Sequence, residues 1–181
     1  ALFAEVERSL GKIDVLLVNA AVVKLTPLSE TTPELFDEVV ATNLRGAFFT
    51  LRAAIPHLKD GASVIFTTSY LNRIGFPGAS VVSMTKAGLR ALVRVAAAEL
   101  GSRSIRVNAL CPGAIATPLW SKLGLPADVL ESAGAEITRQ IPLGRWGSAA
   151  EVARAALFLA SASSAYVNGI ELGIDGGLRQ V

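Results

Sequence analysis

The stretch SVVSMTKAGLRALVRVAAAELG (residues 80–101) is a helix-length segment between two short apolar runs, ASVIFTTS (62–69) and SIRVNALC (104–111). The first of these runs is rich in β-branched and aromatic residues, which favours a buried strand. A strand, a crossover helix and a second strand form a right-handed parallel unit. The stretch therefore predicts an α/β fold with a parallel sheet.

The alternation of strands and helices extends in both directions from this stretch. IDVLLVN (13–19) and GIELGI (169–174) predict further strands, and the segment 1–12 is an amphipathic helix. A chain of 181 residues is long enough to bury a real core, and no internal repeat or linker divides it. We predict a single domain over residues 1–181, with a Rossmann-like, doubly wound parallel sheet.

Capping signals place two more helices. Thr32 is the predicted N-cap of a long helix with Pro33 at its first position, and Ser148 forms a capping box with Glu151. The segment 118–146, which precedes the second of these helices, is less regular, and we expect one or two short helices in it. Its apolar sequence LWSKLGLPADVL indicates a lid over a substrate site.

Composition and charge exclude several classes of protein. The chain is 51% hydrophobic and 18% charged, with a net charge of +2 and scattered basic residues, so we expect no binding to nucleic acid. It contains no apolar run of membrane-spanning length, and we expect neither a membrane segment nor a signal peptide. The single cysteine, Cys111, favours a reducing compartment, and we expect the cytoplasm. Because the chain has only one cysteine and one histidine, a Cys/His metal site is excluded.

Polar and small residues follow the predicted strands. Asn19 and Ser69 are the last residues of two of them, and the segment 112–117 follows a third. Asn43 lies in the middle of a predicted helix, where an amide is mildly unfavourable, and Lys86 lies one turn into the next helix. Because ligands bind beyond the carboxyl ends of parallel strands, we expect these groups to converge at one edge of the sheet.

Four motifs together resemble the short-chain dehydrogenase/reductase family over essentially the whole chain. They are DVLLVNAAV, NLRG, RVNALCPGAIATP and PLGRWGSAAEVARAALFLASASSAYVNGIELGIDGG. Each motif is moderately specific, and their order and spacing make the resemblance strong. It implies hydride transfer on a hydroxyl/carbonyl pair of a small-molecule substrate, with NAD or NADP as cofactor. It also implies a homo-oligomer, a dimer or tetramer, in which the helix 80–101 contacts a partner subunit.

The resemblance also assigns roles to individual residues. It implies that Ser69 binds the substrate oxygen, that Lys86 binds the nicotinamide ribose, and that Asn43 holds the water of a proton relay. The implied cofactor contacts are Asn19, Ala20, Lys86, Pro112, Gly113, Ile115 and Thr117. Each of these residues also has a plainer explanation: a surface lysine, a serine capping a loop, or residues that form a turn.

The first departure from the family concerns the proton donor. The family's tyrosine belongs four residues before Lys86, where this chain has Val82, and an isopropyl group neither donates nor accepts a proton. Tyr70 is the alternative acid. Strand alternation should point Tyr70 away from Ser69 unless the strand has already ended.

The second departure concerns the phosphate site. The family's glycine-rich turn has no counterpart in the sequence, so we expect an N-terminally incomplete domain that contains only the later strands of the fold, with the edge of 13–19 open. Three functions follow. The first is an active oxidoreductase, and the second is a catalytically impaired relative that acts as a nucleotide-binding or assembly subunit. The third is a fragment that binds nothing without its first unit.

Overall fold

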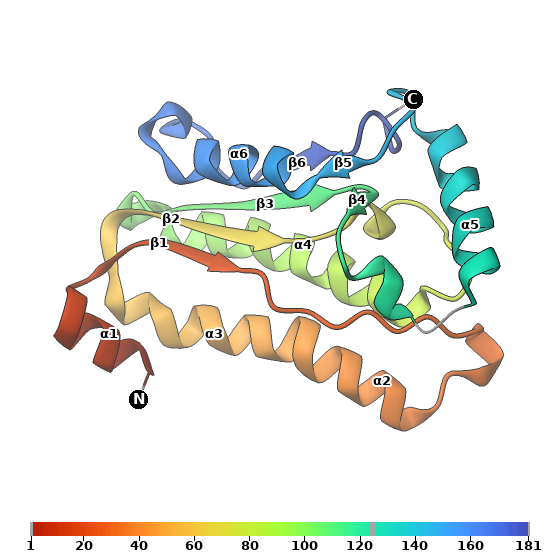
Figure 1. Cartoon of the computed structure of the whole chain (residues 1–181). Helices are drawn as coiled ribbons and strands as arrows, with labels where there is room; N and C mark the ends of the chain where they lie inside the picture. The colour runs from red at the N-terminus through yellow and green to blue at the C-terminus, as the bar shows by residue number, and fades with distance from the viewer. Residues whose placement is uncertain (1, 124–125, 181) are drawn as a thin grey trace.

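Four parallel strands form the central sheet, in the order β1-β2-β3-β6 (Figure 1). The structure is a computed structural model that describes residues 2–123 and 126–180. The strand bounds are β1 Ile13–Val18, β2 Leu58–Thr67, β3 Arg106–Pro112 and β6 Glu171–Ile174. All four predicted strands are thereby confirmed, although β2 begins earlier than expected.

Helices cover both faces of the sheet (Figure 1). Along β2, Val64 and Phe66 face a core shared with α3 and α4, whereas Ile65 points to the other face and packs with Leu159 of α6. This alternation is the period of two that a strand imposes on its side chains. The helices are α1 Leu2–Leu10, α2 Pro33–Val40, α3 Ala47–Ala54, α4 Ser80–Leu100, α5 Ala127–Gln140 and α6 Ala149–Ala160.

The long helix predicted after Thr32 is interrupted in its middle. Its start is as expected, since the Thr32 hydroxyl accepts a hydrogen bond from Leu35 N at 3.3 Å. Between α2 and α3, however, residues Ala41–Gly46 form a π-helical turn. The buried Asn43 lies in this turn. The wider turn explains how an amide is accommodated at a position that disfavours it in a regular helix.

The segment after β3 contains more structure than predicted. A 3₁₀ turn, Trp120–Leu123, precedes α5, which is longer than the short helix expected there. Two short strands, β4 Ile115–Ala116 and β5 Gly147–Ser148, pair in parallel and close the segment 117–146 into a loop. The predicted capping box of α6 is confirmed, with Ser148 and Glu151 bonded reciprocally.

β1 lies at one edge of the sheet, as expected for residues 13–19. Leu16 and Val18 pack into the core with α3 and α4. Val15 and Leu17, on the opposite face, are 43% and 49% exposed. Among the described residues, no helix combines the length and apolar character needed to cross a bilayer.

Candidate functional site

A cavity of about 640 Å³ lies beyond the carboxyl ends of β1, β2 and β3. Its walls come from the ends of these strands, from α4 and from the loop that contains α5. The sequence-predicted residues that line it are Asn19, Ala20, Ser69, Val82, Lys86, Pro112, Gly113, Ile115 and Thr117. The expected convergence at one edge of the sheet is therefore observed for these residues, whereas Asn43 lies outside the cavity lining.

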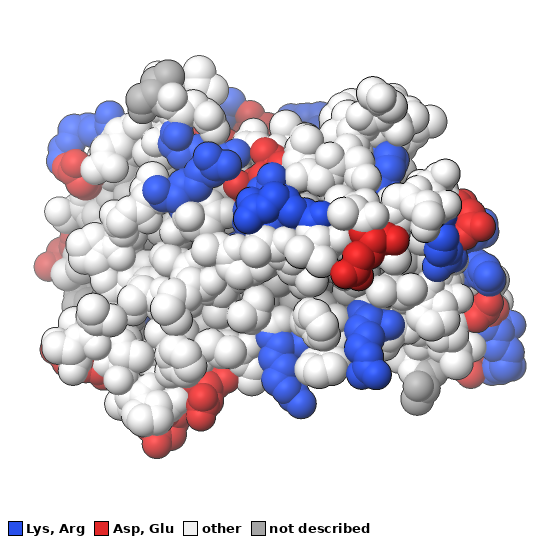
Figure 2. Space-filling view, turned by 180° about the vertical axis from the view of Figure 1, so that it is seen from behind, with Lys and Arg blue, Asp and Glu red and all other residues white. Residues whose placement is uncertain are grey.

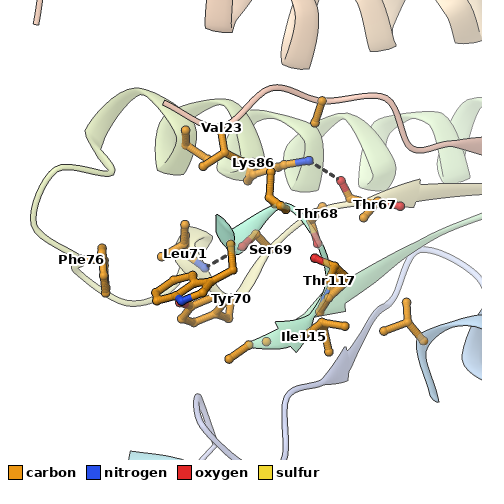
Figure 3. A pocket seen from close by; sticks show the side chains of 18 of the residues that line it. Val23, Thr67, Thr68, Ser69, Tyr70, Leu71, Phe76, Lys86, Ile115 and Thr117 are labelled. Carbon is orange, nitrogen blue, oxygen red and sulfur yellow. Dashed lines mark hydrogen bonds between the residues drawn. The ribbon is translucent and has the colours of Figure 1, made fainter. Parts of the chain in front are cut away.

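Lys86 is a buried cation in the wall of this cavity, only 5% exposed. Its Nζ donates a hydrogen bond to the main-chain oxygen of Thr67 at 2.8 Å (Figure 3). Burial lowers the pKa of Lys86 to about 8, because a charged ammonium is less stable away from water. The group is therefore mainly protonated at pH 7, but it releases its proton more easily than an exposed lysine.

Val82 lies one helical turn before Lys86 and is 1% exposed. It packs in a cluster with Val39 and Val81 and also lines the cavity. The position four residues before the lysine is thus a well-packed apolar one. Neither a proton donor nor a proton acceptor is available from this side chain.

Ser69 and Tyr70 line the same cavity, because β2 has already ended at Thr67. Ser69 caps the 3₁₀ turn Tyr70–Asn72, and its Oγ accepts from Leu71 N at 3.3 Å (Figure 3). The alternation that would have separated the two side chains does not apply beyond the strand. Burial raises the pKa of Tyr70, so its phenol keeps its proton at neutral pH.

Asn43 connects the segment after β1 to α4. Its Oδ1 accepts from Val22 N at 2.8 Å, and its Nδ2 donates to Val22 O at 2.9 Å and to Thr85 Oγ1 at 3.4 Å. Each of these contacts satisfies a polar group that burial would otherwise leave unpaired. The amide thus fixes one wall of the site, and the water relay implied for Asn43 stays a prediction.

The segment 112–117 is held against β6. The amide of Gly113 donates to Ile174 O at 3.0 Å. A Cβ atom at Gly113 would lie 2.7 Å from the Asp175 Cα, so this approach admits only glycine. On the facing wall, Asn19 Oδ1 accepts from Thr67 Oγ1 at 2.8 Å. Residues from three strands are thereby fixed around one opening.

Four aromatic residues form another part of the cavity wall, and the sequence analysis did not predict two of them, Phe76 and Trp146. The rings of Trp120 and Trp146 meet edge to face at 4.9 Å, and Trp146 Nε1 donates to Thr138 Oγ1 of α5 at 2.9 Å. Tyr70 and Phe76 pack in the same cluster. The available signal was that both tryptophans of the chain fall within or beside the predicted lid, 118–146.

Cys111 is fully buried, and burial is the main cause that raises the pKa of its thiol to about 11. It is a small core residue, as its position before a turn suggests.

Across residues 2–123 and 126–180, no group of three or more His, Cys, Asp or Glu side chains is placed to hold a metal ion.

Comparisons with known sequences identify the family. A family model described as enoyl-(acyl carrier protein) reductase matches residues 1–179. The chain is 39% identical over 176 residues to the 3-oxoacyl-[acyl-carrier-protein] reductase FabG of Thermotoga maritima. This match covers 96% of this chain and 69% of that protein. It is 30% identical over 177 residues to the gluconate 5-dehydrogenase of Gluconobacter oxydans, and this match covers 97% of this chain and 68% of that protein.

Solved structures agree with the sequence comparisons. The crystal structure of a gluconate 5-dehydrogenase from Burkholderia cenocepacia, in complex with NADP and tartrate, matches with a TM-score of 0.90 and 31% identity. The match covers 99% of this chain and 69% of that chain. The fold, the cavity at the strand ends and these relatives agree: the chain belongs to the short-chain dehydrogenase/reductase family of oxidoreductases.

Proposed function

We propose that this chain forms the nicotinamide and substrate side of an NAD(P)-dependent oxidoreductase site. The reaction is hydride transfer between the nicotinamide and a hydroxyl/carbonyl pair of a small molecule. The observation that carries the proposal is the cavity in which Lys86 and Ser69 face the segment 112–117. Hydride transfer requires a held nicotinamide and a carbonyl within reach of it, and this cavity has a wall for each.

The residues fit a bound nicotinamide nucleoside. An ammonium has three donors, and the Thr67 carbonyl engages one of them, which leaves donors for the ribose hydroxyls at Lys86. Ile115 and Thr117 hold the carboxamide side, and Ser69 binds the substrate oxygen. Asn19, Ala20, Pro112 and Gly113 supply the remaining walls of the nucleotide position. The nucleotide supplies the hydride when bound, and the chain supplies position and electrostatics.

The proton step is the weak point of the proposed reaction. Val82 offers no proton, and loss of a general acid typically costs about 10²–10⁴-fold in rate. We therefore propose slow rather than absent turnover, with NAD or NADP as the nucleotide. The relatives named above are oxidoreductases, so a subunit that serves only assembly is the less favoured function.

We also propose that the segment 118–146 is the substrate lid. The aromatic pair Trp120 and Trp146 forms the part of this segment that contacts the cavity. Apolar, aromatic walls with few polar groups are typical of sites for small organic molecules. The polar groups that orient the substrate are then Ser69 and Lys86, which line the same cavity.

A homo-oligomer is part of the proposal, because α4 exposes an apolar face. Met84 and Val95 are 52% and 53% exposed, and the alanines at 87, 91 and 98 lie on the same side of the helix. Figure 2 shows the surface behind the sheet, which has a broad uncharged area with charged residues mainly around it. Substitution Val95→Glu should lower the oligomer fraction in light scattering, whereas the exposed Ser102→Glu should not.

The nucleotide claim is tested with the reduced mononucleotide of nicotinamide and with NADPH, each titrated by fluorescence. The mononucleotide probes only the position beside Lys86 and 112–117, independently of any contact to a diphosphate. Lys86→Met should weaken its binding about tenfold or more, since a charge-assisted contact contributes about 1.5–3 kcal/mol. The exposed Lys12→Met is the matched control. Absence of binding by the unchanged protein to both nucleotides contradicts the proposal.

A further inference from the structure

Three charged side chains at the β6 end of the chain are buried without forming part of the cavity wall. The side chains of Glu171, Arg179 and Asp175 are 1%, 3% and 5% exposed. A buried ion pair is often no more stabilising than apolar residues of the same volume. The arrangement therefore calls for an explanation other than stability alone.

One oxygen of Glu171 binds the loop that carries Ser69 from both of its sides. Oε1 accepts from Thr68 Oγ1 at 2.7 Å and from Asn72 Nδ2 at 2.6 Å. These two donors flank the three residues Ser69 to Leu71. Both ends of the turn are thus attached to a single carboxylate at the start of β6, with β3 between β6 and β2 in the sheet.

The other oxygen of Glu171 continues the network toward the nucleotide segment. Oε2 accepts from Arg179 Nη1 at 2.8 Å and lies 3.5 Å from Arg73 Nε. Arg179 Nε in turn donates to Asp175 Oδ2 at 3.0 Å. Asp175 is the residue against which Gly113 packs without room for a Cβ atom.

The network thus contacts both halves of the site. At one end it holds the turn containing Ser69, which the proposed function places at the substrate oxygen. At the other end it abuts Gly113, in the segment proposed to hold the nicotinamide. A catalytic group must be held to within about 0.5 Å of its productive position by supporting hydrogen bonds, and this network provides such support.

We infer that Glu171 is a positioning residue, which holds Ser69 through Thr68 and Asn72 and relates it to the nucleotide segment through Arg179 and Asp175. This inference rests on the proposed function for its effect on turnover. Its structural part, the attachment of the Ser69 turn, is independent of that function. The two parts are therefore measured separately.

The attachment is tested by hydrogen exchange on the folded protein. Glu171→Ala should speed amide exchange in residues 69–73 about tenfold or more, because local opening of the turn no longer breaks two charge-assisted bonds. Exchange in β1 should change little. Glu171→Gln keeps an acceptor and should restore much of the protection. Ile105→Val, a core truncation at the residue just before β3, controls for general destabilisation.

Two milder variants keep the test decisive if Glu171→Ala does not fold. Thr68→Val and Asn72→Ala each remove one of the two donors and should each speed exchange in 69–73. Normal exchange in this turn in folded Glu171→Ala, or in both donor variants, overturns the inference.

Turnover provides the second readout, measured in a Val82→Tyr background. Glu171→Ala should lower kcat for carbonyl reduction about tenfold, because the turn with Ser69 loses its attachment. The Kd for reduced nucleotide should change less than about threefold, because Arg179 and Asp175 keep their own bond beside Gly113. Equal loss of nucleotide affinity and kcat contradicts a positioning role for Glu171. If the unchanged protein binds no nucleotide, the proposed function fails, and the exchange result still decides whether Glu171 holds the turn.

Discussion

The Nζ atom of Lys86 lies 2.8 Å from the main-chain oxygen of Thr67, and this hydrogen bond joins the second turn of α4 to the last residue of β2. Ser69 follows two residues later, so the lysine and the serine are related through a fixed piece of backbone. A buried ammonium is costly, because it gives up its hydration. The protein nevertheless keeps this charge in the cavity wall, which is expected of a functional group and not of a core residue.

Substitution Lys86→Met should stabilise the fold at pH 7. The pKa of Lys86 is about 8 in the folded protein and about 10.4 in an unfolded chain, so the unfolded chain binds more protons between these values. Stability of the unchanged protein should therefore rise as pH increases from about 8 to 10. After loss of the bond to Thr67, the net gain from Lys86→Met at pH 7 should be about 0.5–2 kcal/mol.

The measurement is urea unfolding at pH 7 and pH 10, with the exposed Lys12→Met as control. The gain from Lys86→Met should shrink at pH 10, because the folded lysine is then largely neutral and the protein no longer buries a charge. A less stable Lys86→Met protein at pH 7 would show that burial of this charge costs little.

Removal of the Asn43 amide should destabilise the fold markedly. Asn43→Ala leaves the N–H and C=O of the Val22 backbone without their partner, which should cost about 2–4 kcal/mol. Asn43→Asp keeps the acceptor for Val22 N but places a buried carboxylate oxygen against Val22 O, so its cost in urea unfolding at pH 7 should be at least as large. Equal stability of Asn43→Ala and the unchanged protein would refute the anchoring of this wall by the amide.

The sequence predicts those parts of the fold that depend on local patterns. The four strands follow from short apolar runs, and the Thr32 and Ser148 caps follow from residue types at fixed spacing. The π-helical turn around Asn43 was not predictable in this way, because an inserted residue in a helix leaves no distinct pattern. Its mildly unfavourable asparagine was the only indication.

The residues of the site also fall into those that the sequence predicts and those that it does not. Residues at strand ends, such as Ser69 and Thr117, were found because topology places every strand end at one edge. Glu171 was missed because its role depends on contacts with residues about a hundred positions earlier in the chain. Tyr70 was predicted to point away from Ser69 unless the strand had already ended, and β2 does end before both residues, at Thr67.

The tryptophans of the lid should report on nucleotide binding. Trp120 and Trp146 both line the cavity. The emission of a tryptophan overlaps the absorption band of reduced nicotinamide, so the fluorescence of both residues should be quenched when the nucleotide binds beside them. Trp146→Phe should reduce this signal and should also destabilise the fold by about 1 kcal/mol, through loss of the bond to Thr138. Unchanged tryptophan emission at saturating reduced mononucleotide would place the nicotinamide elsewhere.

Glu171 should make the fold sensitive to acid. Burial raises its pKa, but hydrogen bonds from Thr68, Asn72 and Arg179 outweigh this effect, and the net pKa is lowered. A carboxyl with a lowered folded pKa stabilises above its unfolded pKa of about 4.3, and this contribution is lost as the pH falls through the folded value. Glu171→Gln should therefore cost about 3 kcal/mol at pH 7 and clearly less near pH 3.

Urea unfolding at the two pH values measures this difference. The exposed Glu99→Gln is the control and should show no comparable change. A pH-independent cost for Glu171→Gln would mean that the charge of Glu171 contributes nothing beyond its hydrogen bonds.

The central claim is that this site keeps the residues that hold the reactants and lacks the family's proton-donating tyrosine at position 82. The most direct measurement compares Val82→Tyr with Val82→Phe, which add the same ring with and without a hydroxyl. Because Val82 is fully packed, both should cost about 1–3 kcal/mol of stability. With reduced nucleotide bound, Val82→Tyr should reduce small ketones and aldehydes about tenfold or more faster than Val82→Phe and the unchanged protein. Equal rates for the tyrosine and phenylalanine variants, with nucleotide binding intact, would contradict the claim.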